Sequence, residues 1–146
     1  EEVELSEEEK ALRERKRIAG RKGIVAYDWG TADTILVPIG GDLHLVTLTG
    51  SGVEARQLTD TDAFEYDAKV SPGGGFVSFV RDGAVYAIDL ATGTESRLTP
   101  LGDPGNAIAY GVAEFVAQEE MDRYTGYWWS PDDRFLAYTK VNESTV

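Results

Sequence analysis

From residue 23 onward, the hydrophobic residues fall into short runs rich in β-branched side chains, separated by glycine and aspartate. This pattern predicts β-strands joined by tight turns. The predicted strands cover residues 23–27, 34–38, 43–48, 76–80 and 84–88. Asp82-Gly83 separates the last two runs and is a hairpin signal, because both residue types tolerate the positive φ of a two-residue turn.

The first 22 residues have a different pattern, which predicts a helix over residues 6–19. Ser6 and Glu9 fit a capping box, in which each side chain accepts the backbone amide of the other residue. Acidic residues fill the first turn and basic residues the last, as the helix dipole favours. Gly20 is the expected stop. The apolar stripe is thin, so we expect this helix to lie on a surface.

Two short motifs recur along the chain. Arg-Gln-Leu-Thr at 56–59 returns as Ser-Arg-Leu-Thr at 96–99, 40 residues later, and the Ser-Pro motif at 71–76 returns at 130–135, 59 residues later. A period near 40 with four short strands per unit is typical of β-propeller blades. The sequence therefore predicts an all-β fold, a partial β-propeller of about two to three four-stranded blades over residues 23–146 after an N-terminal segment 1–22.

The longer of the two spacings indicates an insertion within a blade. Its excess of 19 residues lies between Thr99 and Ser130, and we place the insertion at 103–124. Residues 114–123 predict a short helix inside it. A scaffold repeat needs no such excursion, and functional residues often lie on loops that a rigid framework supports.

Glu119 and Glu120 are the chemically distinctive pair in this insertion. Adjacent glutamates are ordinarily part of a solvated helix face. Here, however, aromatic and aliphatic residues surround them in the sequence. Two carboxylates in a partly apolar cleft repel each other, and a ligand ammonium between them would relieve the repulsion and donate up to three hydrogen bonds.

The run from Glu114 to Pro131 (EFVAQEEMDRYTGYWWSP) resembles the double-glutamate segment of the dipeptidyl peptidase IV family. In that family, two consecutive glutamates hold the free α-amino group of the substrate. The resemblance implies these roles for Glu119 and Glu120.

The basic segment 12–18, followed by residues 23–28, is similar to the region before the first blades in bacterial members and in the cytosolic animal branch of the family. There an arginine helps to bind a backbone carbonyl of the substrate. Arg17 is the best match, with Arg13 and Arg15 as alternatives. A basic helix end that suits its dipole is the other interpretation. The mammalian cell-surface enzyme has its arginine in a different loop.

The resemblance extends from about Leu12 to Val146 and implies more than these residues contain. Family members have an eight-bladed propeller that caps a C-terminal α/β-hydrolase domain, and they release N-terminal dipeptides with Pro or Ala in second position. The chain has no Gly-x-Ser-x-Gly nucleophile elbow. We therefore expect a fragment that recognises peptide substrates with a free N-terminus but holds no catalytic residue.

The resemblance also implies a homo-oligomer that is periplasmic or secreted, with a cytoplasmic location left open. The alternative function is a non-catalytic propeller that acts as a protein-interaction module. An intact nucleophile elbow in the sequence beyond Val146 would indicate the enzyme.

Composition excludes several other classes of function. The net charge is −12, and residues 1–22 carry seven acidic and seven basic residues, so the remainder carries all of the excess. Such an acidic body is a poor partner for nucleic acid. Cysteine is absent, and the chain has no apolar run long enough for a membrane span and no visible signal peptide. We expect no metal and no cofactor.

Two further features have ordinary structural interpretations. The Pro-Gly-Gly-Gly run at 72–75 lacks the Lys and Ser/Thr of a phosphate-binding loop and lies at a repeat turn. His44, the only histidine, is expected to be a strand residue and not a catalytic base.

Overall fold

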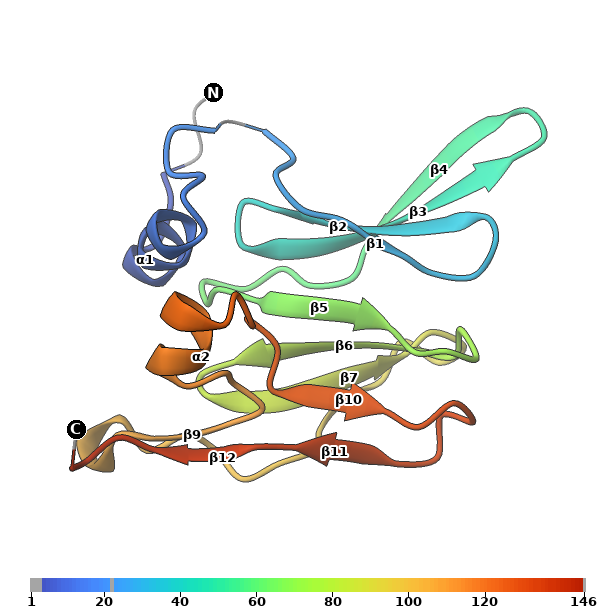
Figure 1. Ribbon diagram of the computed structural model, residues 1–146. Helices are drawn as coiled ribbons and strands as arrows, with labels where there is room; N and C mark the ends of the chain where they lie inside the picture. Colours follow the sequence, from blue (N-terminus) through green and yellow to red (C-terminus); the bar gives the residue numbers. More distant parts are fainter. Residues whose placement is uncertain (1–3, 22, 146) are drawn as a thin grey trace.

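The structure, a computed structural model that describes residues 4–21 and 23–145, consists mainly of antiparallel sheets stacked face to face (Figure 1). The first sheet contains β1 (Asp28–Trp29), β2 (Thr34–Ile39), β3 (Asp42–Thr49) and β4 (Gly52–Gln57) in chain order. The second contains β5 (Tyr66–Val70), β6 (Phe76–Arg81), β7 (Ala84–Asp89) and β8 (Glu95–Arg97), also in chain order. Each is a four-stranded meander, the form of a propeller blade.

The remaining four strands form two two-stranded sheets along one continuous line of chain, and we call the two together the third sheet. β11 (Leu136–Tyr138) and β12 (Lys140–Asn142) follow each other with only Thr139 between them. β10 (Tyr127–Trp129) pairs with β11, and β9 (Ile108–Tyr110) pairs with β12. The short 3₁₀ helix η1 (Pro104–Asn106) precedes β9. Two full blades and part of a third confirm the predicted partial β-propeller.

The sequence repeats correspond to repeated hydrogen bonds. The hydroxyl of Thr59 accepts the amide of Leu43 at 2.8 Å, and that of Thr99 accepts the amide of Val85 at 3.0 Å. In each case a threonine after the fourth strand of a blade ties that strand to the start of the third. The Ser-Pro motifs behave alike, since Ser71 and Ser130 each accept the amide five residues later, at 3.0 and 2.9 Å.

Contacts between sheets form the core and hold the blades together. One cluster joins the first two sheets through Leu36, Leu43, Val77, Phe79 and Ile88. The other joins the second and third sheets through Val80, Val85 and Tyr127. Polar contacts run beside them: the Asp133 carboxylate in the third sheet accepts the Ser71 hydroxyl at 2.6 Å and the Gly73 amide at 2.8 Å. The blades therefore share both an apolar interface and linked turns.

The N-terminal helix α1 (Glu7–Arg15) is shorter than predicted. Its start is as expected, because Ser6 accepts the amide of Glu9 at 3.1 Å. The reciprocal half of the capping box is wrong, since the Glu9 carboxylate accepts hydrogen bonds from Arg13 instead.

The stop at Gly20 is also wrong. Arg17 takes the left-handed conformation that ends the helix, with φ 55°. The amide of Arg17 donates to the carbonyl of Glu14, and that of Ile18 to the carbonyl of Arg13, at 2.8 and 2.9 Å. This Schellman pattern satisfies the last carbonyls before Gly20 is reached.

The predicted hairpin at Asp82-Gly83 is confirmed, with φ values of 51° and 64° between β6 and β7. The predicted strand at 23–27 is wrong, because β1 covers only Asp28–Trp29. Asp28 pairs with Leu36, so the next hydrogen-bonded pair in register would place Ala26 opposite Pro38. Proline has no N–H to donate, and the ladder stops there.

An apolar hollow lies open between the second and third sheets. Phe135 is 67% exposed and Tyr138 42%, and Leu98 of the second blade is 41% exposed beside the same hollow. Within the described residues, β11 and β12 each pair on one edge only. Such surfaces and edges favour association with other chains.

We therefore predict that the 146-residue chain on its own self-associates or exchanges strands. Light scattering across a dilution series should show dimers or larger species that dissociate on dilution. A monodisperse monomer of 15.9 kDa with cooperative unfolding would contradict this prediction.

Candidate functional site

The site is carried by an excursion from the third sheet, between β9 and β10. This arm runs from Gly111 to Gly126 and contains the short helix α2 (Phe115–Glu120), as predicted. The predicted insertion at 103–124 overlaps the arm, and its first residues form η1 and β9. Thr139 closes the base of the arm: its amide donates to Gly126, its carbonyl accepts the amide of Gly111, and its hydroxyl donates to the Val112 carbonyl at 2.7 Å.

Glu119 and Glu120 form the last two residues of α2, and both side chains are exposed. Acidic residues in the last turn of a helix face the negative end of its dipole, which is locally unfavourable. Among the described residues, neither carboxylate accepts a hydrogen bond or forms an ion pair. A cation placed between them would offset the unfavourable interaction with the helix dipole and would give both carboxylates a partner. This end of α2 is therefore chemically suited to an ammonium group.

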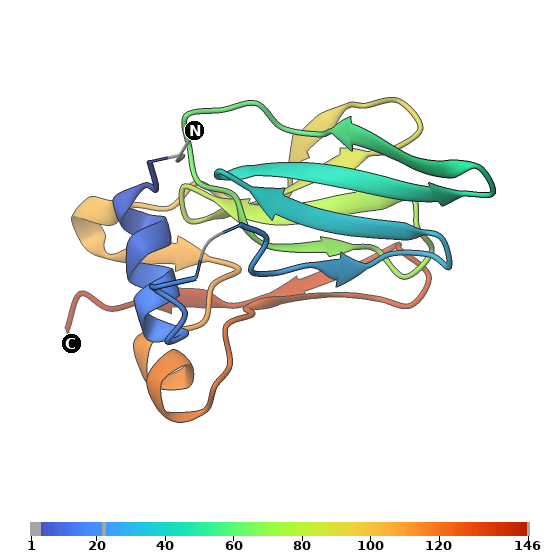
Figure 2. The same cartoon turned by 90° about the horizontal axis from the view of Figure 1, so that it is seen from above.

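Helix α1 lies against α2 at one end of the stacked sheets (Figure 2). The Arg15 guanidinium donates to the side-chain oxygen of Gln118 at 3.1 Å, and the Tyr124 hydroxyl donates to the Arg15 carbonyl at 3.2 Å. The Lys16 ammonium lies 4.9 Å from the centre of the Tyr124 ring. These contacts join the N-terminal segment to the arm, although more than 100 residues of sequence separate them.

The contact between the helices brings two of the predicted site residues together. Arg17 and Glu119 line one open pocket of about 370 Å³, together with Ala11, Glu14 and Arg15. Glu120 is next to Glu119 in the chain but does not line this pocket. The roles of Glu119, Glu120 and Arg17 in binding stay predictions.

The three candidate arginines have different surroundings. Arg13 is buried and forms an ion pair with Glu9 at 2.7 Å. Its guanidinium donates hydrogen bonds to the Glu9 carboxylate at 2.9 Å and to the Arg21 carbonyl at 3.0 Å. Arg15 is engaged with Gln118. The Arg17 side chain is exposed. Arg17 is therefore the best placed of the three to receive a ligand beside Glu119.

Sequence reasoning missed a polar cluster that supports the arm from the second sheet. Lys69 forms an ion pair with Asp67 at 2.7 Å and donates to the Thr125 hydroxyl at 2.7 Å. Its ammonium lies 3.8 Å from the centre of the Tyr127 ring, and the Tyr127 hydroxyl donates to the Asp67 carbonyl at 2.6 Å. Burial raises the pKa of Asp67 and lowers the pKa of Lys69, while their mutual attraction opposes both shifts.

This cluster holds Thr125, on the segment that leads from α2 back into β10. The only sequence signal near it is the aromatic run at 127–129. Tyr127 is fully buried, Trp128 is 44% exposed, and the half-buried Trp129 stacks on Phe76 with 5.6 Å between ring centres. Nothing in the sequence links Lys69 to residues almost 60 positions away.

Comparison with known proteins identifies the family of the chain. A family model described as the dipeptidyl peptidase IV (DPP IV) N-terminal region matches residues 26–146. The chain belongs to the dipeptidyl peptidase IV family. Dipeptidyl peptidase 8 of Mus musculus is 36% identical over 143 residues, and a probable dipeptidyl peptidase 4 of Aspergillus flavus is 40% identical over 81 residues. These alignments cover 86% and 54% of this chain but only 16% and 10% of the relatives.

A comparison with solved structures shows a similar fold. The crystal structure of Porphyromonas gingivalis dipeptidyl peptidase 4 superposes with a TM-score of 0.64 over 91% of this chain and 20% of that chain, at 24% sequence identity. The chain thus spans between 10% and 20% of the length of these relatives. In the part of the chain that the structure describes, no helix is long and apolar enough to cross a membrane.

The surroundings of the arginines lead to a prediction about local stability. Arg13→Ala leaves the buried Glu9 carboxylate without its partner, which costs about 3 kcal/mol, the low end for a buried ion pair. Hydrogen exchange of the α1 amides should therefore accelerate by about 30-fold or more. Arg17→Ala removes the same charge from an exposed side chain and serves as the matched control. Equal protection of α1 in both variants would contradict the distinct roles assigned to the two arginines.

Proposed function

We propose that these residues recognise the free amino terminus of peptides in a serine exopeptidase that releases N-terminal dipeptides. The observation that carries the proposal is the pair of exposed glutamates at the carboxyl end of α2, with Arg17 beside Glu119 in one pocket. The membership of the dipeptidyl peptidase IV family and the names of the relatives support the reaction class.

In this proposal the substrate ammonium lies between the carboxylates of Glu119 and Glu120. The ammonium supplies only donors and the carboxylates only acceptors, so up to three charge-assisted hydrogen bonds form. Arg17 donates to the first backbone carbonyl of the peptide. Fixing both groups sets the distance to the second peptide bond, and therefore selects a dipeptide. A blocked amino terminus loses the charge and the donors, and is rejected.

The bond-breaking groups belong, in this proposal, to an α/β-hydrolase domain outside these 146 residues. A serine of that domain attacks the carbonyl carbon of the second residue, with Pro or Ala preferred there. The peptide bond after this residue breaks, the rest of the peptide leaves with a new amino terminus, and water then hydrolyses the ester to release the dipeptide. The propeller supplies positioning and no catalytic residue. We further propose a homo-oligomer and a periplasmic or secreted location, on the resemblance to bacterial members alone.

Removal of either glutamate tests the amine site. In the full-length enzyme, Glu119→Ala or Glu120→Ala should lower kcat/KM on a Gly-Pro chromogenic substrate by about 30-fold or more, because each truncation leaves the substrate charge under-paired. Arg17→Ala should lower kcat/KM by a smaller factor, and part of that decrease should appear in kcat. Glu54→Ala, an exposed acid on β4 far from α2, is the control and should match the wild type. Wild-type activity in all three site variants would show that the site is assigned wrongly.

The division of labour gives a second prediction. The purified 146-residue chain should not turn over the same Gly-Pro substrate, because it contains no nucleophile elbow. Turnover above a buffer blank by this chain, retained after further purification, would rule out a purely recognitional role.

A further inference from the structure

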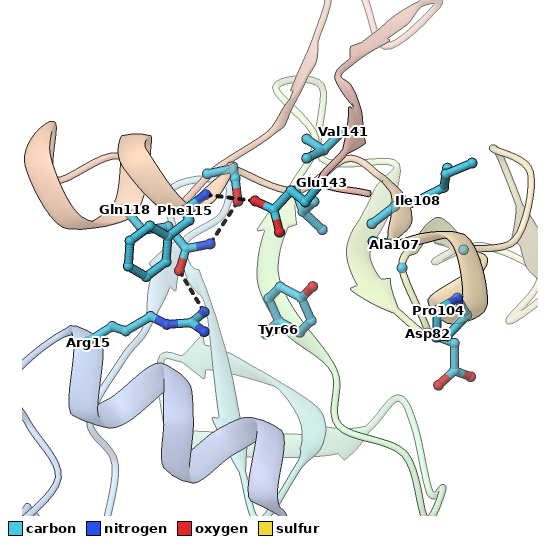
Figure 3. A pocket seen from close by; sticks show the side chains of 15 residues that line it. Arg15, Tyr66, Asp82, Pro104, Ala107, Ile108, Phe115, Gln118, Val141 and Glu143 are labelled. Atoms are coloured by element: carbon cyan, nitrogen blue, oxygen red, sulfur yellow. Dashed lines mark hydrogen bonds between the residues drawn. The ribbon is translucent and has the colours of Figure 1, made fainter. Parts of the chain in front are cut away.

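Helix α2 carries the two glutamates but receives little support from apolar packing. Of its six residues only Ala117 is buried, while Phe115 and Val116 are 54% and 53% exposed. A pocket of about 360 Å³ lies beneath it, between α2, the end of α1 and the strands β9 and β12 (Figure 3). A helix of six residues is far below the length that is stable alone. Its position must therefore depend on specific polar contacts.

The amino end of α2 lacks the usual cap from its own sequence. Glu114 occupies the N-cap position, but its side chain makes no capping bond. Instead, its carboxylate forms an ion pair with Arg123 at 2.9 Å. The first helical amide, that of Phe115, donates to the carboxylate of Glu143 at 3.1 Å (Figure 3).

Glu143 is well suited to hold the helix because its own backbone is fixed. It directly follows β12, and its amide donates to the carbonyl of Ala107 at 3.0 Å, which extends the ladder between β12 and β9. A carboxylate at a helix amino end also matches the positive end of the dipole. The side chain thus links α2 to the rigid third sheet over 28 residues of sequence.

The other direct contact of α2 comes from α1. Gln118 donates to the carbonyl of Ala113 at 2.7 Å and accepts from Arg15 at 3.1 Å. Gln118 therefore ties α2 to the arm itself and to the N-terminal segment, whereas Glu143 ties it to the sheet. Of these contacts, only that of Glu143 links α2, and so the two glutamates, directly to the strands of the blade.

We propose that Glu143 is a positioning residue that sets the place of Glu119 and Glu120 through the first amide of α2. The inference rests on the proposed function, because it assigns Glu143 a role in amine recognition without contact with the substrate. Glu143 acts as a hydrogen-bond acceptor, so an amide oxygen at the same place should serve.

The test compares kcat/KM on the Gly-Pro chromogenic substrate among full-length variants. Glu143→Ala removes the acceptor, and Phe115→Pro removes the donor while placing proline at the first helical position, where it is tolerated. Each should lower kcat/KM about tenfold, because a free energy of the size that a helix cap contributes is lost from the positioning of α2. Glu143→Gln and Phe115→Ala keep the bond and should stay within about twofold of the wild type.

Two combinations separate positioning from a general structural role. The double variant E143A/F115P should be no worse than either single variant, since both break the same bond. In a Glu119→Gln enzyme, adding Glu143→Ala should lower kcat/KM by less than about twofold, because the group that Glu143 positions is already impaired. The inference would be overturned if the losses in kcat/KM were additive in both combinations, or if Glu143→Gln lowered kcat/KM as much as Glu143→Ala does.

Failure of the inference and failure of the proposed function give different results. A Glu119→Gln enzyme with wild-type activity would refute the amine site itself. An impaired Glu119→Gln enzyme beside a fully active Glu143→Ala enzyme would refute only the positioning role. Thermal melting checks each variant: if Glu143→Ala does not fold, Phe115→Pro decides, and unfolding of both would show a global role and overturn the inference.

Discussion

The position of the candidate site depends on one set of hydrogen bonds, those of Thr139. This residue lies between β11 and β12, and its backbone and hydroxyl groups bind both ends of the arm, at Gly111, Val112 and Gly126. The arm thereby separates β9 from β10, and both strands stay paired with the continuous segment that forms β11 and β12. The arm leaves and re-enters the sheet at a single point, so the blade keeps its pairing while α2 stands clear of it.

The chemistry of the arm follows from features that are unfavourable for a helix. Two acids lie at the negative end of α2, apolar side chains are exposed along it, and a pocket lies beneath it. Each of these lowers local stability, and each is tolerated because polar contacts from α1, β12 and the Lys69 cluster fix the arm from three directions. Local conflicts of this kind tend to gather at functional sites, where the ligand resolves them.

Much of the architecture could be predicted from the sequence, because it depends on local chemistry. The Thr59 and Thr99 motifs form the same bond in two blades, and Asp82-Gly83 has the positive φ values that its residue types allow. The local predictions that proved wrong failed because a competing side chain or a residue farther along the chain decided the outcome. Arg13 took the Glu9 carboxylate from the expected cap, and Pro38 ended the ladder before residues 23–27 could join it.

For the candidate site, the sequence indicated the glutamates and the arginine but not what holds them. Glu143 and Lys69 lie in no motif, and the run that contains Gln118 gives no sign of its partner. Their contacts join residues that only the folded sheets bring together.

The divided strand also bears on how such a protein can change over evolutionary time. Because Thr139 binds both ends of the arm, the number of residues between them is not fixed by the sheet register. Residues can be gained or lost there at a loop-closure cost that grows only slowly with length. The blade thus provides a site at which new recognition segments can be exchanged, while the scaffold sequence and its folding are conserved.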